Sequence, residues 1–317
     1  MGRVLALELA VQGVADARVA ADAGADRVEL CSALRATGGL TPSLALIEQV
    51  VDVGLAVHVL IRCRPGPFVY DDAEVAVLVR DAELAVRAGA AGIVFGALTA
   101  GNALGGGDRA GRAGVDVGAV ARVRDAARSV NPNAEITFHR AFDVLVGAGP
   151  ASADPIGDAA DLIGDDRAGA DHMATFLSQL IALGCTRVLT SGGATRSIDG
   201  APVLAELVRQ ASSRIQIMAG GGVRPGDIAG LAACGVDAVH LSAARPVARP
   251  GPPAGPGGGG DLIDVTDLGI ARAARRAVDR ATLARGRTAA LTSVVIRTNH
   301  ELRRGRLLHQ RHGRHHL

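Results

Sequence analysis

The chain has 317 residues, of which 48% are hydrophobic and 21% are charged, a composition typical of a folded protein with a sizeable core. A net charge of +2 gives no strong field towards a nucleic acid or a membrane surface, and 2% aromatic residues leave few side chains for base stacking. These numbers argue against nucleic-acid binding as the main function and against a largely disordered chain.

Strand-like and helix-like runs alternate from the first residues. The predicted strands are Val4–Leu9, Arg27–Cys31, Leu55–Ile61, Gly92–Phe95, Glu135–His139, Arg187–Thr190, Arg214–Met218 and Ala238–Leu241. The predicted helices are Val14–Ala23, Leu44–Val53, Ala73–Ala88, Asp116–Arg128, Met173–Leu183, Val203–Ala211, Asp227–Ala233 and Asp264–Ala284. Strict alternation predicts an α/β fold with a parallel sheet closed into a (β/α)8 TIM-like barrel, and an open doubly wound sheet is the alternative.

Residues 1–284 are therefore predicted to form one barrel domain. Three segments rich in glycine, alanine, proline or aspartate, near 101–114, 144–171 and 249–260, are expected to be mobile surface insertions. Residues 285–317 form a basic tail rich in arginine and histidine that the barrel does not account for, and its histidines could bind metal adventitiously.

The cysteine pattern and the N-terminus predict a reduced, cytoplasmic setting. Four cysteines are too few and too widely spaced for a disulfide framework, and no CxxC pair suggests zinc. The first ten residues do not resemble a signal peptide, and no apolar run reaches the roughly 18 residues of a membrane span. Cys185 and Cys234 precede predicted strands and are interpreted as structural.

The absence of lysine excludes one branch of chemistry. All 34 basic residues are arginine. Schiff-base aldolases and pyridoxal-phosphate enzymes need a lysine amine, and an arginine stays protonated and cannot replace it.

Polar side chains gather at the C-terminal ends of the predicted strands, where barrels of this kind carry their sites. In Ile136–Asp143 an apolar strand ends abruptly in ionisable residues. Strand alternation places a polar set on the inward face, and its members are Glu8, Glu29, His58, Arg62, Thr137, His139, His240 and Ser242. Such a cluster points to acid–base chemistry. The alternative is a polar layer held by ion pairs, such as Glu8 or Glu29 with Arg62.

Two further features could bind ligands. The triple glycine Gly220–Gly222 follows the seventh strand, where barrels often bind phosphate through backbone N–H groups, although a tight turn would also need glycine. Cys31 and Cys63 lie near the ends of neighbouring strands, and two thiolates would favour Cu(I). Two unrelated small hydrophobic residues are the alternative for this pair.

A series of motifs between about residues 4 and 244 follows one order: Gly24–Cys31, Gly38–Ser43, Val57–His58, Ile61–Arg62, Thr137–Asp143, Arg187–Gly192, Ile217–Val223 and His240–Ala243. In this order they resemble the CutC family, usually described as copper homeostasis proteins. The resemblance implies a TIM-like barrel, a cytoplasmic location and copper binding. Ala10 and Val69 stand where family members commonly have cysteine, whereas Cys63 is gained.

The leading hypothesis is a cytoplasmic protein that takes part in copper homeostasis and binds Cu(I). Cys31 is the best thiol candidate, with histidines of the mouth as candidate co-ligands, and a two-coordinate site of Cys31 and Cys63 is a local solution. The rival is a lysine-independent lyase, isomerase or hydrolase acting on a small anionic substrate, phosphorylated or not. Its predicted catalytic residues are Glu8, Glu29, His58, His139, Asp143 and His240. Its predicted ligand-binding residues are Arg62, Arg140, Ser191, Gly220, Gly221, Gly222 and Ser242. A non-catalytic sensor is a third hypothesis, the expected partner is a copper ion or a small anionic ligand, and a homodimer is left open.

Overall fold

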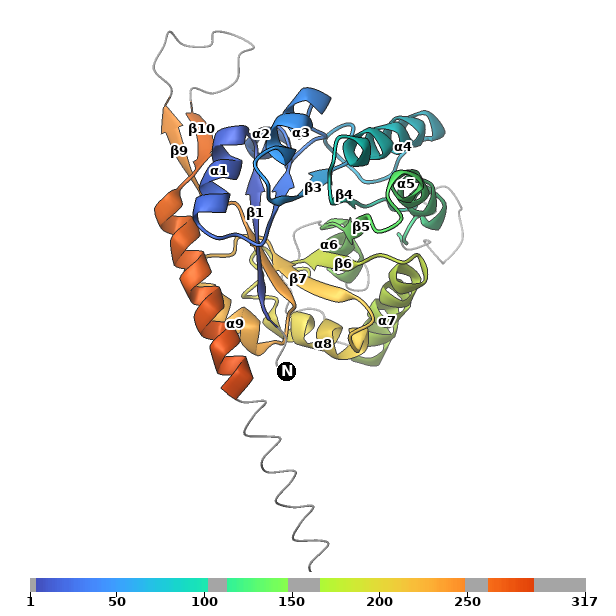
Figure 1. Ribbon diagram of the computed structural model, residues 1–317. Helices are drawn as coiled ribbons and strands as arrows, with labels where there is room; N and C mark the ends of the chain where they lie inside the picture. The colour runs from blue at the N-terminus through green and yellow to red at the C-terminus, as the bar shows by residue number, and fades with distance from the viewer. Residues whose placement is uncertain (1–3, 102–112, 148–165, 249–261, 288–317) are drawn as a thin grey trace, which may run out of the picture.

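The computed structural model describes residues 4–101, 113–147, 166–248 and 262–287 (Figure 1). Side chains at the start of the helix that begins at 166 are described from residue 172 onwards. Most of the three predicted insertions and of the basic tail lies outside these ranges. Within them, no helix is both long and apolar enough to cross a bilayer.

Eight parallel strands close into a barrel, as the strict alternation of the sequence predicts (Figure 1). They are β1 (Ala6–Val11), β2 (Arg27–Leu30), β3 (Ala56–Leu60), β4 (Gly92–Phe95), β5 (Glu135–Phe138), β6 (Arg187–Thr190), β7 (Gln216–Gly220) and β8 (Ala238–Leu241). The barrel is closed because β1 pairs with both β2 and β8. An open doubly wound sheet is therefore excluded.

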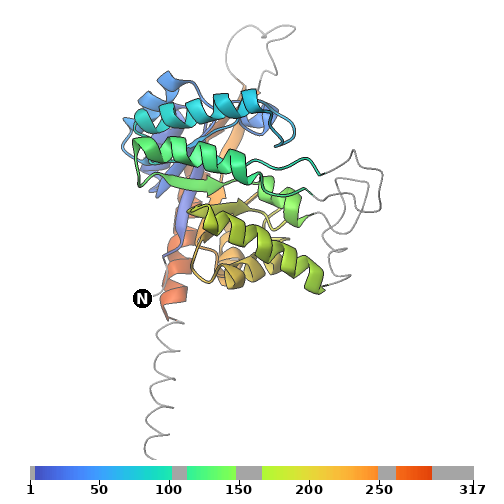
Figure 2. The ribbon, with the colours of Figure 1, turned by 90° about the vertical axis from the view of Figure 1, so that its right-hand side faces the viewer.

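Helices cover the outside of the barrel, and Figure 2 shows α4, α5 and α7 lying one after another across one side. The covering helices are α1 (Val14–Asp22), α3 (Leu44–Val51), α4 (Asp72–Arg87), α5 (Val117–Val130), α7 (Asp166–Ala182), α8 (Ala201–Ala211), α9 (Ile228–Ala233) and a last helix over residues 268–287. Three short helices lie in loops after strands: α2 (Leu34–Thr37), α6 (Ala141–Val146) and the 3-10 turn η2 (Pro225–Asp227). Local sequence sets these boundaries, as in α4, which begins at a capping box between Asp71 and Glu74.

An antiparallel hairpin follows β8 and was not expected from the sequence. It consists of β9 (Ala244–Ala248) and β10 (Leu262–Thr266), and it lies beside α1 in Figure 1. The predicted helix start at Asp264 is wrong, because Asp264–Thr266 belong to β10. The helix begins instead after Asp267, whose carboxylate accepts the N–H of Ile270 at 3.0 Å. The β-branched residues of β10 favour a strand, but residues 249–261 separate β10 from its partner β9 in the sequence.

The two faces of the strands separate apolar from polar residues, as strand alternation predicts. The outward side chains belong to the large core between barrel and helices: Leu7, Leu9, Val28, Leu30, Val57, Val59, Ile61, Ile136, Phe138, Val239 and Leu241. The barrel interior holds two small apolar clusters, one of Cys31, Leu60 and Val94 and one of Leu189, Met218 and Ala238. Much of the remaining interior is polar and charged, and this is where the candidate site lies.

Candidate functional site

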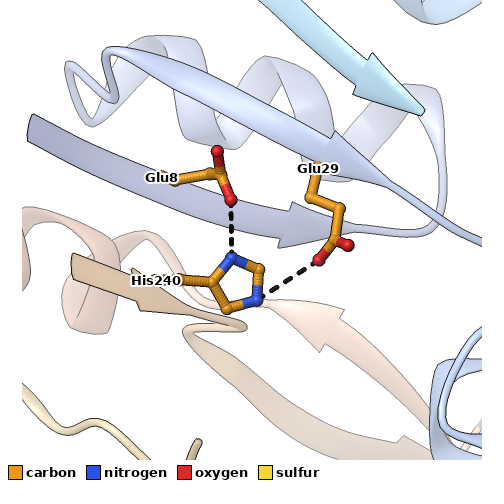
Figure 3. Close-up of side chains that lie close together, drawn as sticks. All are labelled: Glu8, Glu29 and His240. Atoms are coloured by element: carbon orange, nitrogen blue, oxygen red, sulfur yellow. Dashed lines mark hydrogen bonds and ion pairs between the residues drawn. The ribbon is translucent and has the colours of Figure 1, made fainter. Parts of the chain in front are cut away.

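His240 lies between two glutamates near the mouth of the barrel (Figure 3). Its Nδ1 is 2.8 Å from Oε1 of Glu8, and its Nε2 is 3.3 Å from Oε2 of Glu29. The three residues meet because β8, β1 and β2 are adjacent and Glu8 pairs in register with His240. Glu8 is fully buried and Glu29 is 6% exposed, so both carboxylates act in a medium of low polarity.

The three groups have pKa values shifted in different directions. Burial raises the pKa of Glu29, and the nearby charge of Glu8 adds to this effect although His240 opposes it. Burial would raise the pKa of Glu8 too, but the charge of Arg27, the hydrogen bond from His240 and the neighbouring His58 ring outweigh burial and hold that pKa well below its ordinary value. Burial opposes the ionised form of His240, yet the two carboxylates raise the pKa of its ring. Two neighbouring carboxyls with opposite shifts are the arrangement that separates an acid from a base.

A second group of charges lies towards the N-terminal ends of the strands, and sequence analysis missed three of its members. Arg27 pairs with Glu8 at 2.5 Å, and Arg187 pairs with Glu135 at 2.5 Å. Arg187 also donates to Thr137 at 3.0 Å. The ion-pair interpretation with Arg62 was therefore wrong in its partner, since Glu8 is paired with Arg27.

His58 connects this group to the rest of the interior. The guanidinium of Arg187 lies 3.2 Å from Nδ1 of His58 and has only protons to offer, so Nδ1 accepts. The proton is then on Nε2, which faces Glu135 at 3.2 Å. This arrangement engages both nitrogens of His58 in contacts with other side chains.

Arg62 and His139, both predicted site residues, lie together but apart from Glu29 and His240. The two terminal nitrogens of Arg62 donate to the carbonyls of residues 37, 39 and 66, and its Cζ lies 5.0 Å from the centre of the Phe68 ring. The His139 ring is 4.7 Å from the same ring, and its Nδ1 accepts the N–H of Ala141. Burial and the charges of Arg62 and Arg140 lower the pKa of His139 to about 3. A ring that stays neutral at physiological pH donates hydrogen bonds but is a poor proton shuttle.

Arg140, Asp143 and Ser191 form a third group, at the ends of β5 and β6. Asp143 accepts hydrogen bonds from Arg140 Nε at 2.7 Å, Thr190 Oγ1 at 2.5 Å and Ser191 N at 2.9 Å. Arg140 also donates to Ser191 Oγ at 3.2 Å. Asp143 therefore fixes the loop after β6 and orients Arg140. These hydrogen bonds leave few lone pairs of the Asp143 carboxylate for a substrate.

The glycine loop after β7 lies against this third group. Gly221 has a φ of 125°, and a Cβ there would be 3.1 Å from Cζ of Arg140. A Cβ at Gly220 would be 2.3 Å from a methyl carbon of Leu189. Close packing thus explains these glycines directly, and it also brings the loop backbone beside a half-exposed guanidinium that could hold an anionic group.

The two cysteines of the predicted thiol pair pack in different clusters. Cys31 is fully buried with Leu60 and Val94 inside the barrel, whereas Cys63 packs against the outer core. Burial raises the pKa of both thiols, with the charge of Glu29 adding to the shift at Cys31 and that of Glu74 at Cys63. Copper binding through these residues needs thiolates that converge, so the residues present do not fit a two-thiolate Cu(I) site.

Glu8, Glu29 and His240 form the one cluster of three metal-ligating side chains within the described ranges. Their ligand atoms lie within 4.8 Å of one another. However, the two ring nitrogens point at different carboxylates (Figure 3), so one metal ion cannot bind both nitrogens, and an ion shared by Nε2 and Glu29 would replace the proton between them. The geometry fits a proton held between carboxylates better than a metal ion.

A closed (β/α)8 barrel with buried carboxylates and imidazoles near its mouth defines the class: a TIM-barrel protein with a polar internal site. The particular family follows from comparison. The model of the CutC family matches residues 5–153 and 167–245, and the chain belongs to this family.

Relatives and a solved structure agree with this assignment. A Xanthomonas campestris pv. campestris (strain B100) protein described as "family protein CutC" is 41% identical over 248 residues, which are 77% of this chain and 85% of that protein. One from Pasteurella multocida (strain Pm70) is 37% identical over 238 residues, with coverage of 74% and 81%. The crystal structure of a Streptococcus agalactiae protein described as a candidate copper homeostasis protein, CutC, is 28% identical, with a TM-score of 0.59 and coverage of 75% of this chain and 98% of that chain.

Proposed function

We propose that the chain is an enzyme that moves protons on a small substrate at the mouth of the barrel, with Glu29 and His240 as the acid–base pair. The observation that carries the proposal is the position of the His240 ring between two buried carboxylates (Figure 3). Within the described residues, Glu29 forms an ion pair with His240 and with no guanidinium, so its charge is free to respond to a proton. A carboxyl with a raised pKa is suited to general acid–base catalysis near neutral pH.

The other predicted site residues would orient His240 or bind the substrate. Glu8, fixed by Arg27, orients His240 through its 2.8 Å hydrogen bond. Arg140 and the backbone of Gly221, the residue after the register partner of His240, could bind an anionic group beside the pair. This arrangement suits a lysine-independent lyase, isomerase or hydrolase rather than a carbonyl chemistry that passes through an amine.

A role in copper homeostasis in the cytoplasm is the second candidate function, and the family name supports it. The described geometry gives it little support, because Cys31 and Cys63 pack in different clusters. An anaerobic Cu(I) titration against a competing chelator tests it with two variants, Cys31→Ser and a chain shortened before the histidine-rich tail. Tight one-to-one binding that needs Cys31 would restore the copper hypothesis.

The enzyme proposal is tested by a substrate search with matched inactive variants. Wild-type protein, Glu29→Gln and His240→Asn are incubated with fractionated small-molecule extracts, and consumption of each compound is followed by NMR. We expect a compound that wild type consumes at least about a hundredfold faster than either variant, because general acid–base groups contribute this much. Equal turnover by folded Glu29→Gln would rule out the assigned role of this carboxylate. His139→Ala is included because His139 is a predicted catalytic residue, whose removal should then abolish turnover.

A further inference from the structure

A small polar pocket lies at the mouth of the barrel beside the proposed acid–base pair. Its volume is about 150 Å³, and its lining residues come from β1, α1, α2, the end of β8 and the hairpin: Ala10, Gln12, Asp16, Leu34, Ser242, Ala244, Asp264 and Thr266. Ala10 pairs in register with Glu29, and Ser242 lies two residues after His240. Two of the lining residues are therefore close, in strand register or in sequence, to the groups that would do the chemistry.

The hairpin completes this pocket, although the family match ends at residue 245, near the start of β9. Two contacts hold the hairpin in place. The N–H of Thr266 donates to Asp16 Oδ1 at 2.9 Å, and Arg35 pairs with Asp264 at 2.6 Å. β10 thus supplies two polar residues to a mouth that the matched part of the chain leaves more open.

The polar atoms of the pocket select for a group that donates hydrogen bonds. Arg35 engages Oδ1 of Asp264, and Oδ2 of Asp264 accepts no hydrogen bond from the described residues. The side-chain carbonyl of Gln12 accepts the N–H of Leu34 at 2.8 Å, which leaves its NH2 group to donate. With Asp16 also in the lining, two carboxylates would repel an anion, whereas they would accept from a hydroxyl or an ammonium group.

We propose that this pocket binds a small hydroxyl- or amine-bearing group that donates to Asp264 and Ser242, with the NH2 group of Gln12 donating to a hydroxyl oxygen of the ligand. As a substrate subsite it rests on the proposed function, but its binding is measurable without turnover. The substrate would then carry a donor end here and an anionic end at Arg140, beside the glycine loop that follows β7. A wider groove of about 1020 Å³ shares Gln12, Asp16 and Asp264 with the pocket and offers a path from solvent.

The test uses ethanolamine as the probe and acetate as a probe of similar size and opposite charge. Each is titrated into the labelled full chain, and the amide signals of Gln12 and Thr266 are followed by NMR. We expect saturable shifts with ethanolamine and none with acetate. Acetate binding at the same signals with equal affinity would overturn the proposal.

Two pairs of variants locate the binding. Asp264→Asn should weaken ethanolamine binding about tenfold, because a hydrogen bond to a charged acceptor is lost. Arg35→Ala breaks the same exposed ion pair but keeps the carboxylate, so it should bind as tightly as wild type or more tightly. Ala10→Leu should fill the pocket and abolish binding, whereas Ala76→Leu adds the same volume at an exposed position of α4 that lines neither the pocket nor the groove.

Ser242→Val narrows the pocket at a second lining residue if Ala10→Leu does not fold. Ethanolamine affinity that is unchanged in both Asp264→Asn and the pocket-filling variant would refute the assignment. A failed substrate search would leave a positive binding result intact, and an absence of ethanolamine binding would leave the Glu29–His240 proposal untouched.

Discussion

The interior of the barrel contains two charged regions that use similar residues in different ways. In the paired layer, Glu8, Glu135 and His58 contact Arg27 or Arg187 at 2.5–3.2 Å. In the mouth layer, defined by Glu29, His240 and His139, no described guanidinium forms an ion pair with Glu29, and His139 stays neutral. A buried charge with a fixed counter-charge is therefore structural, whereas a buried charge that faces only a titratable neighbour is suited to chemistry.

The paired layer should respond most strongly to loss of a charge. In Arg27→Met the fully buried Glu8 loses its guanidinium partner, and we expect the free energy of unfolding to fall by about 3–5 kcal/mol. Chemical denaturation measures this. The control Arg80→Met breaks the exposed Arg80–Glu83 pair and should leave stability close to wild type. A loss in Arg27→Met no larger than in the control would show that Glu8 needs no counter-charge.

The mouth layer should be sensitive to packing even where it lacks ion pairs. A Cβ at Gly96 would lie 2.6 Å from Cε1 and Nδ1 of the buried His139 ring, so Gly96→Ala must displace that ring. We expect destabilisation by about 1–3 kcal/mol, typical of overpacking. Gly226→Ala is the matched control, because a Cβ there meets no atom within 4 Å. Equal stability of the two variants in thermal unfolding would mean that the His139 ring is loosely held.

Removing the charge of Glu29 tests whether it sets the protonation of His240. The Glu29 carboxylate raises the pKa of His240, so Glu29→Gln should lower that pKa while the fold is retained. The ring signals of His240, followed by NMR over pH, report it. Glu48→Gln removes an exposed carboxylate and should leave the titration unchanged. An unchanged pKa of His240 in Glu29→Gln would contradict the proposed pair.

The sequence predicts the barrel and much of its interior because both follow from local periodicity. Strand alternation alone places Glu8, Glu29, His58 and His240 on the inner face, and the structure joins them in one network. Cys63 lies beyond the end of β3 and packs against the outer core, whereas Cys31 belongs to the interior cluster.

Other features depend on partners distant in the chain. Arg27 points to the same face of β2 as Glu29, but it stands at the start of the strand. Because barrel sites lie at the C-terminal ends of strands, sequence alone does not mark Arg27 as a site residue. Arg187 is 50 residues from Thr137 and 52 from Glu135, and no local pattern indicates that contact. The two strands of the β9–β10 hairpin are separated by residues 249–261. Because local periodicity does not show this pairing, it predicts Asp264–Thr266 as the start of a helix.

The two histidines of the mouth layer should give opposite limbs to the pH dependence of stability. His139 has a folded pKa of about 3, below the unfolded value of about 6.5, so the unfolded chain binds the extra proton and stability falls as pH drops below about 6.5. His240 has a raised folded pKa, so its contribution is complete below about 6.5 and is lost as pH rises through the folded value.

Denaturation at a series of pH values separates these limbs, because each proton changes the slope by at most about 1.4 kcal/mol per pH unit. His139→Gln should flatten the acid limb, leaving only the part due to groups such as Glu8, whose lowered pKa also costs stability as pH falls. His240→Gln should flatten the alkaline limb and leave the acid limb in place. Slopes rather than absolute stabilities decide the matter, since either substitution can shift the whole curve. If both variants flattened the same limb, the two imidazoles would share one environment, and the division between a neutral ring and a proton-sharing ring would fail.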